Sequence, residues 1–182
     1  MLMTGLFANC KCRSKHLMYG VGYFYPSFYD ETINDIKTGK YGSEIKNLFN
    51  KTKSVTVDAE YEIYWCPECG YFNDPVCLDL YKPTNSETAE SSSSYFIPDF
   101  YGDENYILFK EYEHMCPKCG KLMQKVATKK EQNDYYKKQE EAYEKGERTK
   151  TGEDIYTIKI NKLTCPECGE KYQAQEDFTI YD

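Results

Sequence analysis

The chain contains three copies of one short motif: CPECG at 66–70, CPKCG at 116–120 and CPECG at 165–169. Each copy brings two thiols together in one tight turn. The proline after the first cysteine stiffens the turn, and the glycine after the second allows backbone angles that other residues resist. Because structural zinc takes four soft ligands in a tetrahedron, each copy is half of a zinc site, a zinc knuckle.

The three knuckles supply six thiols, two fewer than two complete sites need. Cys10 and Cys12, in NCKCRSKH, make up the difference. We therefore predict two four-cysteine sites holding two Zn²⁺ ions, with the ligands Cys10, Cys12, Cys66, Cys69, Cys116, Cys119, Cys165 and Cys168. The ninth cysteine, Cys77, is left over, and we expect it to be an ordinary packing residue.

The order of the motifs suggests how the half-sites pair. Each half of the chain has a cysteine pair, an insert with helical content, an alternating strand and a CPECG knuckle. If the chain is a duplicated unit, one site contains Cys10, Cys12, Cys66 and Cys69, and the other contains Cys116, Cys119, Cys165 and Cys168. The long inserts are tolerable, because each doubling of loop length costs only about 0.6 kcal/mol.

Other uses of the same cysteines stay open. An iron–sulfur cluster takes the same thiolates. CxxC pairs also form disulfides or carry out thiol-redox chemistry, although a thioredoxin-type motif begins a helix, whereas these knuckles follow strands and repeat. His16 and His114 lie near cysteines in the sequence and could each replace a thiolate, but a surface or packing role is the simpler interpretation. Cys77 as a reactive thiol is a further alternative.

No pattern typical of an enzyme accompanies the cysteines. Catalytic zinc keeps one coordination position open, whereas four thiolates close the site. GVG at 20–22 is not completed to a dinucleotide loop, and no GK[ST] sequence occurs. We therefore expect a protein that is not an enzyme.

The knuckles, and the strands expected to lead into Cys66, Cys116 and Cys165, resemble the zinc-ribbon class. In that class, two knuckles at the tips of β-hairpins clamp one ion. The chain is also similar to small uncharacterised bacterial zinc-ribbon proteins. The resemblance implies a structural metal and brings no activity with it. CKC at 10–12 departs from the pattern, being one residue shorter and lacking both proline and glycine.

Period-two patterns predict strands over 54–65 and 154–164, and 105–115 is expected to be a strand because the second half repeats the plan of the first; each leads into a knuckle. An aromatic stretch over 16–30 predicts a strand or hairpin that turns at Pro26. Short helices are expected from Asp30 to Gly39 and from Ser43, and a solvated helix within 129–147. Return strands are expected over 77–81 and 177–181. The predicted fold class is mainly β with a few short helices, a small α+β fold.

The predicted domains are two zinc-ribbon-like units with helical inserts, at 1–82 and 95–182. The polar, serine-rich segment PTNSETAESSSS between them, at 83–94, has too few apolar residues to order itself and is expected to be a flexible linker.

Charge and composition limit the classes of partner that we expect the protein to bind. The 182-residue chain has a formal net charge of −7, and only two of its 23 basic residues are Arg, so polyanions are disfavoured. No stretch approaches the roughly 20 apolar residues of a membrane span, and the N-terminus lacks a basic region typical of a signal peptide. A cytoplasmic location, where thiols stay reduced, is the simplest expectation.

These observations predict a zinc-binding protein whose surfaces act as a protein-binding or adaptor module. Its expected partner is another protein, with no membrane partner. A nucleic-acid-associated zinc-ribbon protein is the first alternative, and a thiol-redox enzyme is the second.

Overall fold

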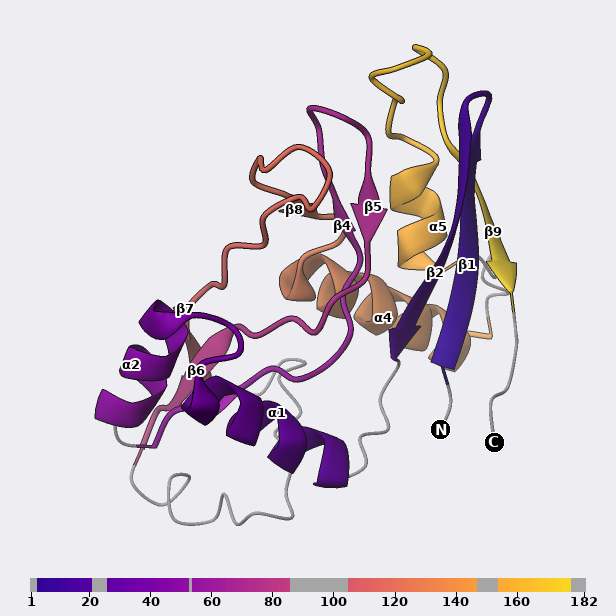
Figure 1. Ribbon diagram of the computed structural model, residues 1–182. Helices are drawn as coiled ribbons and strands as arrows, with labels where there is room; N and C mark the ends of the chain where they lie inside the picture. Colours follow the sequence, from indigo (N-terminus) through magenta and orange to yellow (C-terminus); the bar gives the residue numbers. More distant parts are fainter. Residues whose placement is uncertain (1–2, 21–25, 53, 86–104, 147–153, 178–182) are drawn as a thin grey trace. The chain divides into compact units, whose positions relative to one another are not determined.

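The computed structural model describes residues 3–20, 26–52, 54–85, 105–146 and 154–177 (Figure 1). The chain forms two compact units: unit 1 consists of Gly22–Tyr61 and Val76–Tyr112, and unit 2 of Leu2–Val21, Glu62–Pro75 and Glu113–Asp182. The α+β class is confirmed, since the described ranges contain four helices and three antiparallel sheets of three strands each. From position 86 onward, the expected linker at 83–94 lies outside the described residues.

Unit 1 packs two helices with one sheet. The helices are α1 (Pro26–Thr38) and α2 (Ser43–Lys51), and the sheet has the order β3 (Thr56–Val57), β6 (Leu80–Pro83), β7 (Tyr106–Lys110). Each element except β7 gives a buried residue to one core cluster, which includes Ile36, Ile45, Val57 and Leu80. Cys77 also lies in this unit and is fully buried, as expected of a packing residue.

Two predictions for unit 1 need correction. The segment expected as a strand or hairpin over 16–30 is a strand up to Gly20 and a helix from Pro26, whose fixed φ suits a first helical turn, while positions 21–25 lie outside the described residues. The strand expected over 54–65 is present only as β3 and β4 (Tyr64–Trp65). Between them, Asp58 and Ala59 are both buried, so the side chains do not alternate between a core face and a solvent face.

Two other predictions for this unit, both of helices, are confirmed in part. The helix expected from Asp30 to Gly39 begins earlier, at Pro26, but it ends as expected, at Thr38 directly before Gly39, which has a φ of 94°. The helix expected from Ser43 is also present, but Gly42 rather than Ser43 is its N-cap.

The larger sheet of unit 2 joins the two ends of the chain. Strands β1 (Met3–Cys10) and β2 (Arg13–Gly20) form a hairpin, and β9 (Gln173–Asp177) pairs with the other edge of β1. The side chains of β1 alternate, with Leu6 and Ala8 buried and Phe7 exposed between them. The rest of the return strand expected over 177–181 lies outside the described residues.

The segment expected as a strand over 154–164 instead contains helix α5 (Ile155–Ile160), so that prediction is wrong. Asp154 caps this helix, accepting a hydrogen bond from the Tyr156 amide at 2.8 Å. Ile155, Tyr156 and Ile160 enter the core beside Leu6. The β-branched alternation favours a strand locally, but burial of adjacent residues in this core favours the helix.

A second small sheet of unit 2 has the order β5 (Phe72–Asn73), β4, β8 (Gln124–Lys125), and helix α4 (Lys129–Glu144) follows it. The predicted charged helix is therefore confirmed. It begins with a capping box between Thr128 and Glu131. Within this helix, Tyr143 is largely exposed, whereas Gln132 is buried.

A buried carboxylate connects α4 and α5 to the segment before the first knuckle. Glu62 is 1% exposed and lies 3.0 Å from Lys129 Nζ. The Tyr156 hydroxyl and the Gln132 side-chain amide donate to the same carboxylate at 2.5 and 3.2 Å. Because a buried charge is tolerated only with such partners, Glu62 holds this segment in place four residues before Cys66.

Candidate metal centres

The eight predicted ligands lie together in two groups of four within unit 2. Site 1 consists of Cys10, Cys12, Cys165 and Cys168, and site 2 consists of Cys66, Cys69, Cys116 and Cys119. In each site the four sulfur atoms lie within 4.8 Å of one another. Each group could therefore hold one metal ion.

A duplicated chain predicted a different grouping of the half-sites, and that prediction is wrong. Strand pairing explains the difference. Strand β9 pairs with β1 with Asn9 opposite Gln173, which brings the third knuckle beside Cys10. Strand β8 pairs with β4 with Trp65 opposite Gln124, which brings the second knuckle beside the first.

The sulfur separations fit one ion in each site. Cys10 and Cys12 are 3.6 Å apart and Cys12 and Cys165 are 3.5 Å apart in site 1. In site 2, the Cys66–Cys119 and Cys69–Cys116 separations are 3.5 and 3.6 Å. A tetrahedron with metal–sulfur bonds of about 2.3 Å places its sulfurs roughly 3.8 Å apart, whereas a disulfide needs about 2.05 Å. The thiols are therefore spaced for a shared ion and not for disulfides.

The three knuckles have the same backbone structure. In each, the amide of the first cysteine donates to the carbonyl five residues later, and the glycine amide donates back to the first cysteine. One residue pair closes each hairpin: Trp65 with Phe72, Met115 with Leu122, and Thr164 with Lys171. The knuckle glycines Gly70, Gly120 and Gly169 have φ values of 66°, 68° and 72°. This is the left-handed region expected for the motif.

Cys10 and Cys12 reach site 1 by a different route. Cys10 is the last residue of β1, and its partner across the hairpin is Arg13. Lys11 and Cys12 form the two-residue turn between them. A tight β-hairpin thus supplies the two thiols that a CPxCG knuckle supplies elsewhere, which explains why CKC needs neither the proline nor the glycine.

The protonation of the thiols shows the effect of crowding four of them together. Burial opposes ionisation of Cys165, but the interaction with the Tyr172 side chain and hydrogen bonds from the amides of Cys168 and Glu167 outweigh it and lower the pKa to about 6. Cys116 behaves in the same way, with its pKa lowered to about 7 by the amides of Cys119 and Lys118. By contrast, desolvation and neighbouring thiols raise the pKa of Cys69 to about 12. Four thiolates can therefore coexist only around a cation.

The two sites rest on different cores. Cys165 belongs to the main core cluster of unit 2 with Leu6 and Tyr172, and Cys10 and Cys168 pack against it. Cys66 and Cys116 form a smaller cluster with Tyr64 and Met123. Each site also has one exposed thiol, Cys12 or Cys119. Site 2 therefore has the smaller apolar cluster behind it.

The alternative ligands considered from the sequence lie elsewhere. His16 stacks on Phe7, with ring centroids 4.6 Å apart, and buried His114 lies against Tyr64 at 4.2 Å. Neither histidine belongs to a cysteine group. An iron–sulfur cluster of the four-iron type does not suit the sulfur spacing, because its cysteines bind separate irons and lie farther apart. One four-coordinate ion fits in each of the two groups.

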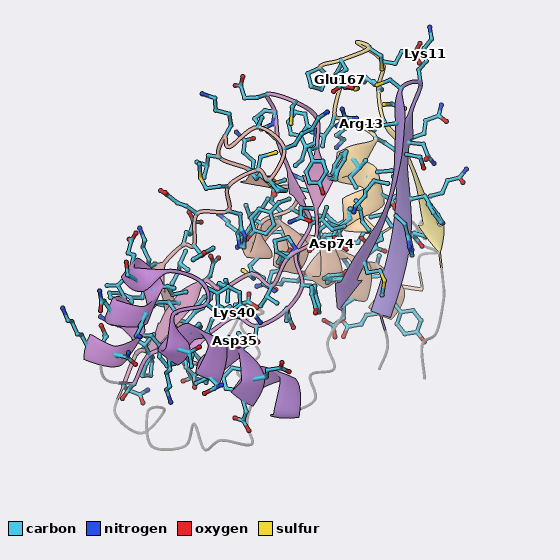
Figure 2. The ribbon with its side chains drawn as sticks, in the orientation of Figure 1. Lys11, Arg13, Asp35, Lys40, Asp74 and Glu167 are labelled. Carbon is cyan, nitrogen blue, oxygen red and sulfur yellow. The ribbon has the colours of Figure 1, made fainter. Side chains whose placement is uncertain are left out.

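One charged cluster beside the sites was not expected from the sequence. Glu167, inside the third knuckle, pairs with Arg13 at 2.5 Å and with Lys118, inside the second knuckle, at 2.9 Å. Figure 2 shows Arg13 and Glu167 facing each other near the turn of the β1–β2 hairpin. The hydrogen bonds from Arg13 and Lys118 lower the pKa of Glu167 to about 2. The only indication of this cluster in the sequence was the middle residue of two knuckles, Lys118 in the second and Glu167 in the third.

No protein-family model, curated protein or solved structure matches the chain. What the structure shows is the two groups of four cysteines and the common hairpin geometry of the three knuckles. Among the described residues, no helix has the length and apolar character needed to cross a membrane.

Proposed function

We propose that the protein is a zinc-binding protein in which two structural Zn²⁺ ions shape a surface that binds another protein. The main supporting observation is the gathering of eight cysteines into two four-sulfur groups, with the reported sulfur separations at 3.5–3.6 Å. Tetrahedral four-thiolate sites take zinc or iron, and structural sites of this kind usually hold zinc. When bound, zinc supplies folding free energy to unit 2.

The stoichiometry tests the metal part of this proposal. We expect native mass spectrometry of protein expressed in zinc-supplemented medium to show two zinc ions per chain, both lost in denaturing solvent. All nine cysteines should then react with a thiol reagent. Iron in place of zinc would change the metal assignment, and a mass deficit matching disulfides would support the redox alternative instead.

No catalytic step is part of the proposal, because four thiolates around one ion leave no position for a substrate. Nucleic-acid binding is not part of it either. The cations beside the sites are paired, Lys11 with Glu170, and Arg13 and Lys118 with Glu167. Each divalent ion with four thiolates would also carry a net charge of −2, so two loaded sites would add further negative charge beside these paired cations.

The hairpin of the second knuckle supports a protein partner. Met115 and Leu122 face each other across its closing pair, and they are 56% and 50% exposed. Two large apolar side chains side by side on a hairpin held by a metal form a small contact surface whose shape depends on metal loading.

A paired variant tests this surface. Replacing Met115 and Leu122 together by Lys should abolish cross-links between zinc-loaded protein and its partner at this hairpin, while both zinc ions stay bound. Leu108→Lys is the matched control, because Leu108 is 47% exposed but lies on β7 of unit 1. Unchanged cross-linking in the double variant would show that the partner binds elsewhere, and sedimentation velocity would reveal whether that partner is a second copy.

A further inference from the structure

Knuckles that belong to different metal sites touch inside unit 2. Gly70 ends the first knuckle of site 2 and is buried. A Cβ atom placed on Gly70 would lie 2.7 Å from Cδ of Pro166, which follows Cys165 of site 1, and 2.5 Å from the Tyr172 hydroxyl. Because real Cβ atoms do not approach other heavy atoms so closely, only glycine allows this contact.

The other knuckle glycines show that this crowding is specific. Gly120 and Gly169 have nearly the same φ as Gly70, yet a Cβ atom at either position would meet nothing within 4 Å. All three positions need glycine for the turn. Gly70 alone among them also needs it for packing against the other site.

Tyr172 continues this contact into the core. Its hydroxyl donates to the Gly70 carbonyl at 3.0 Å, and its ring lies edge-on to Phe72 with centroids 4.9 Å apart. Tyr172 is 1% exposed and follows the third knuckle, so it is held by the chain of site 1 while it binds the chain of site 2. A buried hydrogen bond of this kind is costly to lose, because the carbonyl has no water to replace its donor.

Charge pairs also link the two sites, but more weakly. The Arg13–Glu167–Lys118 cluster lines an open hollow of about 400 Å³. Lys118 and Glu167 are 49% and 42% exposed, so water and salt screen their attraction. The packing of Gly70, Pro166 and Tyr172 is therefore the stronger link between the sites.

We infer that the two metal sites load cooperatively, with Gly70 and Tyr172 as the positioning residues that couple them. This inference rests on the proposed function. A metal ion at site 1 orders the turn that carries Pro166 and the segment that carries Tyr172, against which the first knuckle of site 2 packs. By linkage, a metal ion at site 2 must favour loading of site 1 by the same factor, which for couplings of this kind is about tenfold.

The coupling is measured by comparing the zinc affinity of site 1 in two chains. Competition with a chromophoric chelator gives each affinity. One is the natural chain, and the other carries Cys116→Ser and Cys119→Ser so that site 2 cannot bind. We expect site 1 to bind zinc about tenfold more weakly when site 2 is disabled. Native mass spectrometry of the same samples counts the ions bound.

Glycine variants then assign the cause. Gly70→Ala should remove the difference between the two chains, whereas Gly120→Ala, with the same backbone strain in the same site, should preserve it. If Gly70→Ala prevents folding, Tyr172→Phe provides the test, because it removes the hydroxyl and keeps the ring beside Phe72. If the natural chain binds two zinc ions but disabling site 2 leaves the zinc affinity of site 1 unchanged, only the coupling is overturned. A natural chain that binds no metal would overturn both the coupling and the proposed function.

Discussion

Chelation of the metal ions is expected to remove the amide protection of unit 2 while unit 1 keeps its own. Structural zinc in small domains contributes about 10–16 kcal/mol of apparent binding free energy at neutral pH, as much as the whole stability of a typical domain. The small sheet β5-β4-β8 has strands of only two residues, too short to stand alone. We therefore expect it to depend on the metal at site 2.

Hydrogen–deuterium exchange of the protein, before and after treatment with a strong chelator, measures this effect. The amides of Cys66, Cys116 and Cys165, which bond within their knuckles, should exchange far faster after metal removal. Peptides from the core of unit 1, around Ile36, Val57 and Leu80, serve as the internal control. Knuckle amides that stay protected after verified loss of both ions would show that the metal does not hold the fold.

The cysteines could be predicted as metal ligands because each knuckle is a local structure. CPxCG and the residue after it contain the turn, the backbone hydrogen bonds and the glycine angle, so the three copies form the same hairpin tip in different surroundings. The count of eight thiols then brought in Cys10 and Cys12 despite their different pattern. Local motifs and a count of thiols were therefore enough for this part of the site.

The grouping of the half-sites could not be predicted in the same way. It depends on which strands pair across most of the chain, as Ala8 of β1 does with Ala174 of β9. The apparent duplication suggested that neighbours in sequence share a site, but the closing of the sheet by the last strand joins the first and last thiols instead. Strand partners are set by the whole core, which short patterns do not describe.

Helix α5 shows a second limit of the sequence patterns. The run IYTIKI alternates as a strand would, and its β-branched residues favour that state. The Asp154 cap and the burial of Ile155, Tyr156, Thr157 and Ile160 favour a helix instead. A cap is visible in the sequence, so Asp154 was the one local signal that could have corrected the prediction.

Replacement of one buried ligand is expected to have the second large effect. Cys165→Ser should weaken zinc binding at site 1 at least about 100-fold, since even changes outside the ligand shell cost 10–100-fold. Cys165 is fully buried in the main core of unit 2, so the serine hydroxyl would also lie among apolar groups without a metal. We therefore expect the variant to lose the ion of site 1 and to melt well below the natural protein.

Cys77→Ala is the matched control, because Cys77 is equally buried but belongs to neither four-cysteine group. It should cost about 1 kcal/mol through the small cavity it leaves and should retain both ions. Native mass spectrometry counts the ions, and thermal melting with and without added zinc separates loss of metal from loss of packing. Added zinc should not restore the packing that Cys77→Ala loses in unit 1, and it should not restore the ion of site 1 in Cys165→Ser at the concentrations used. Two ions retained by Cys165→Ser, or one lost by Cys77→Ala, would contradict the assignment of the thiols that hold the metal.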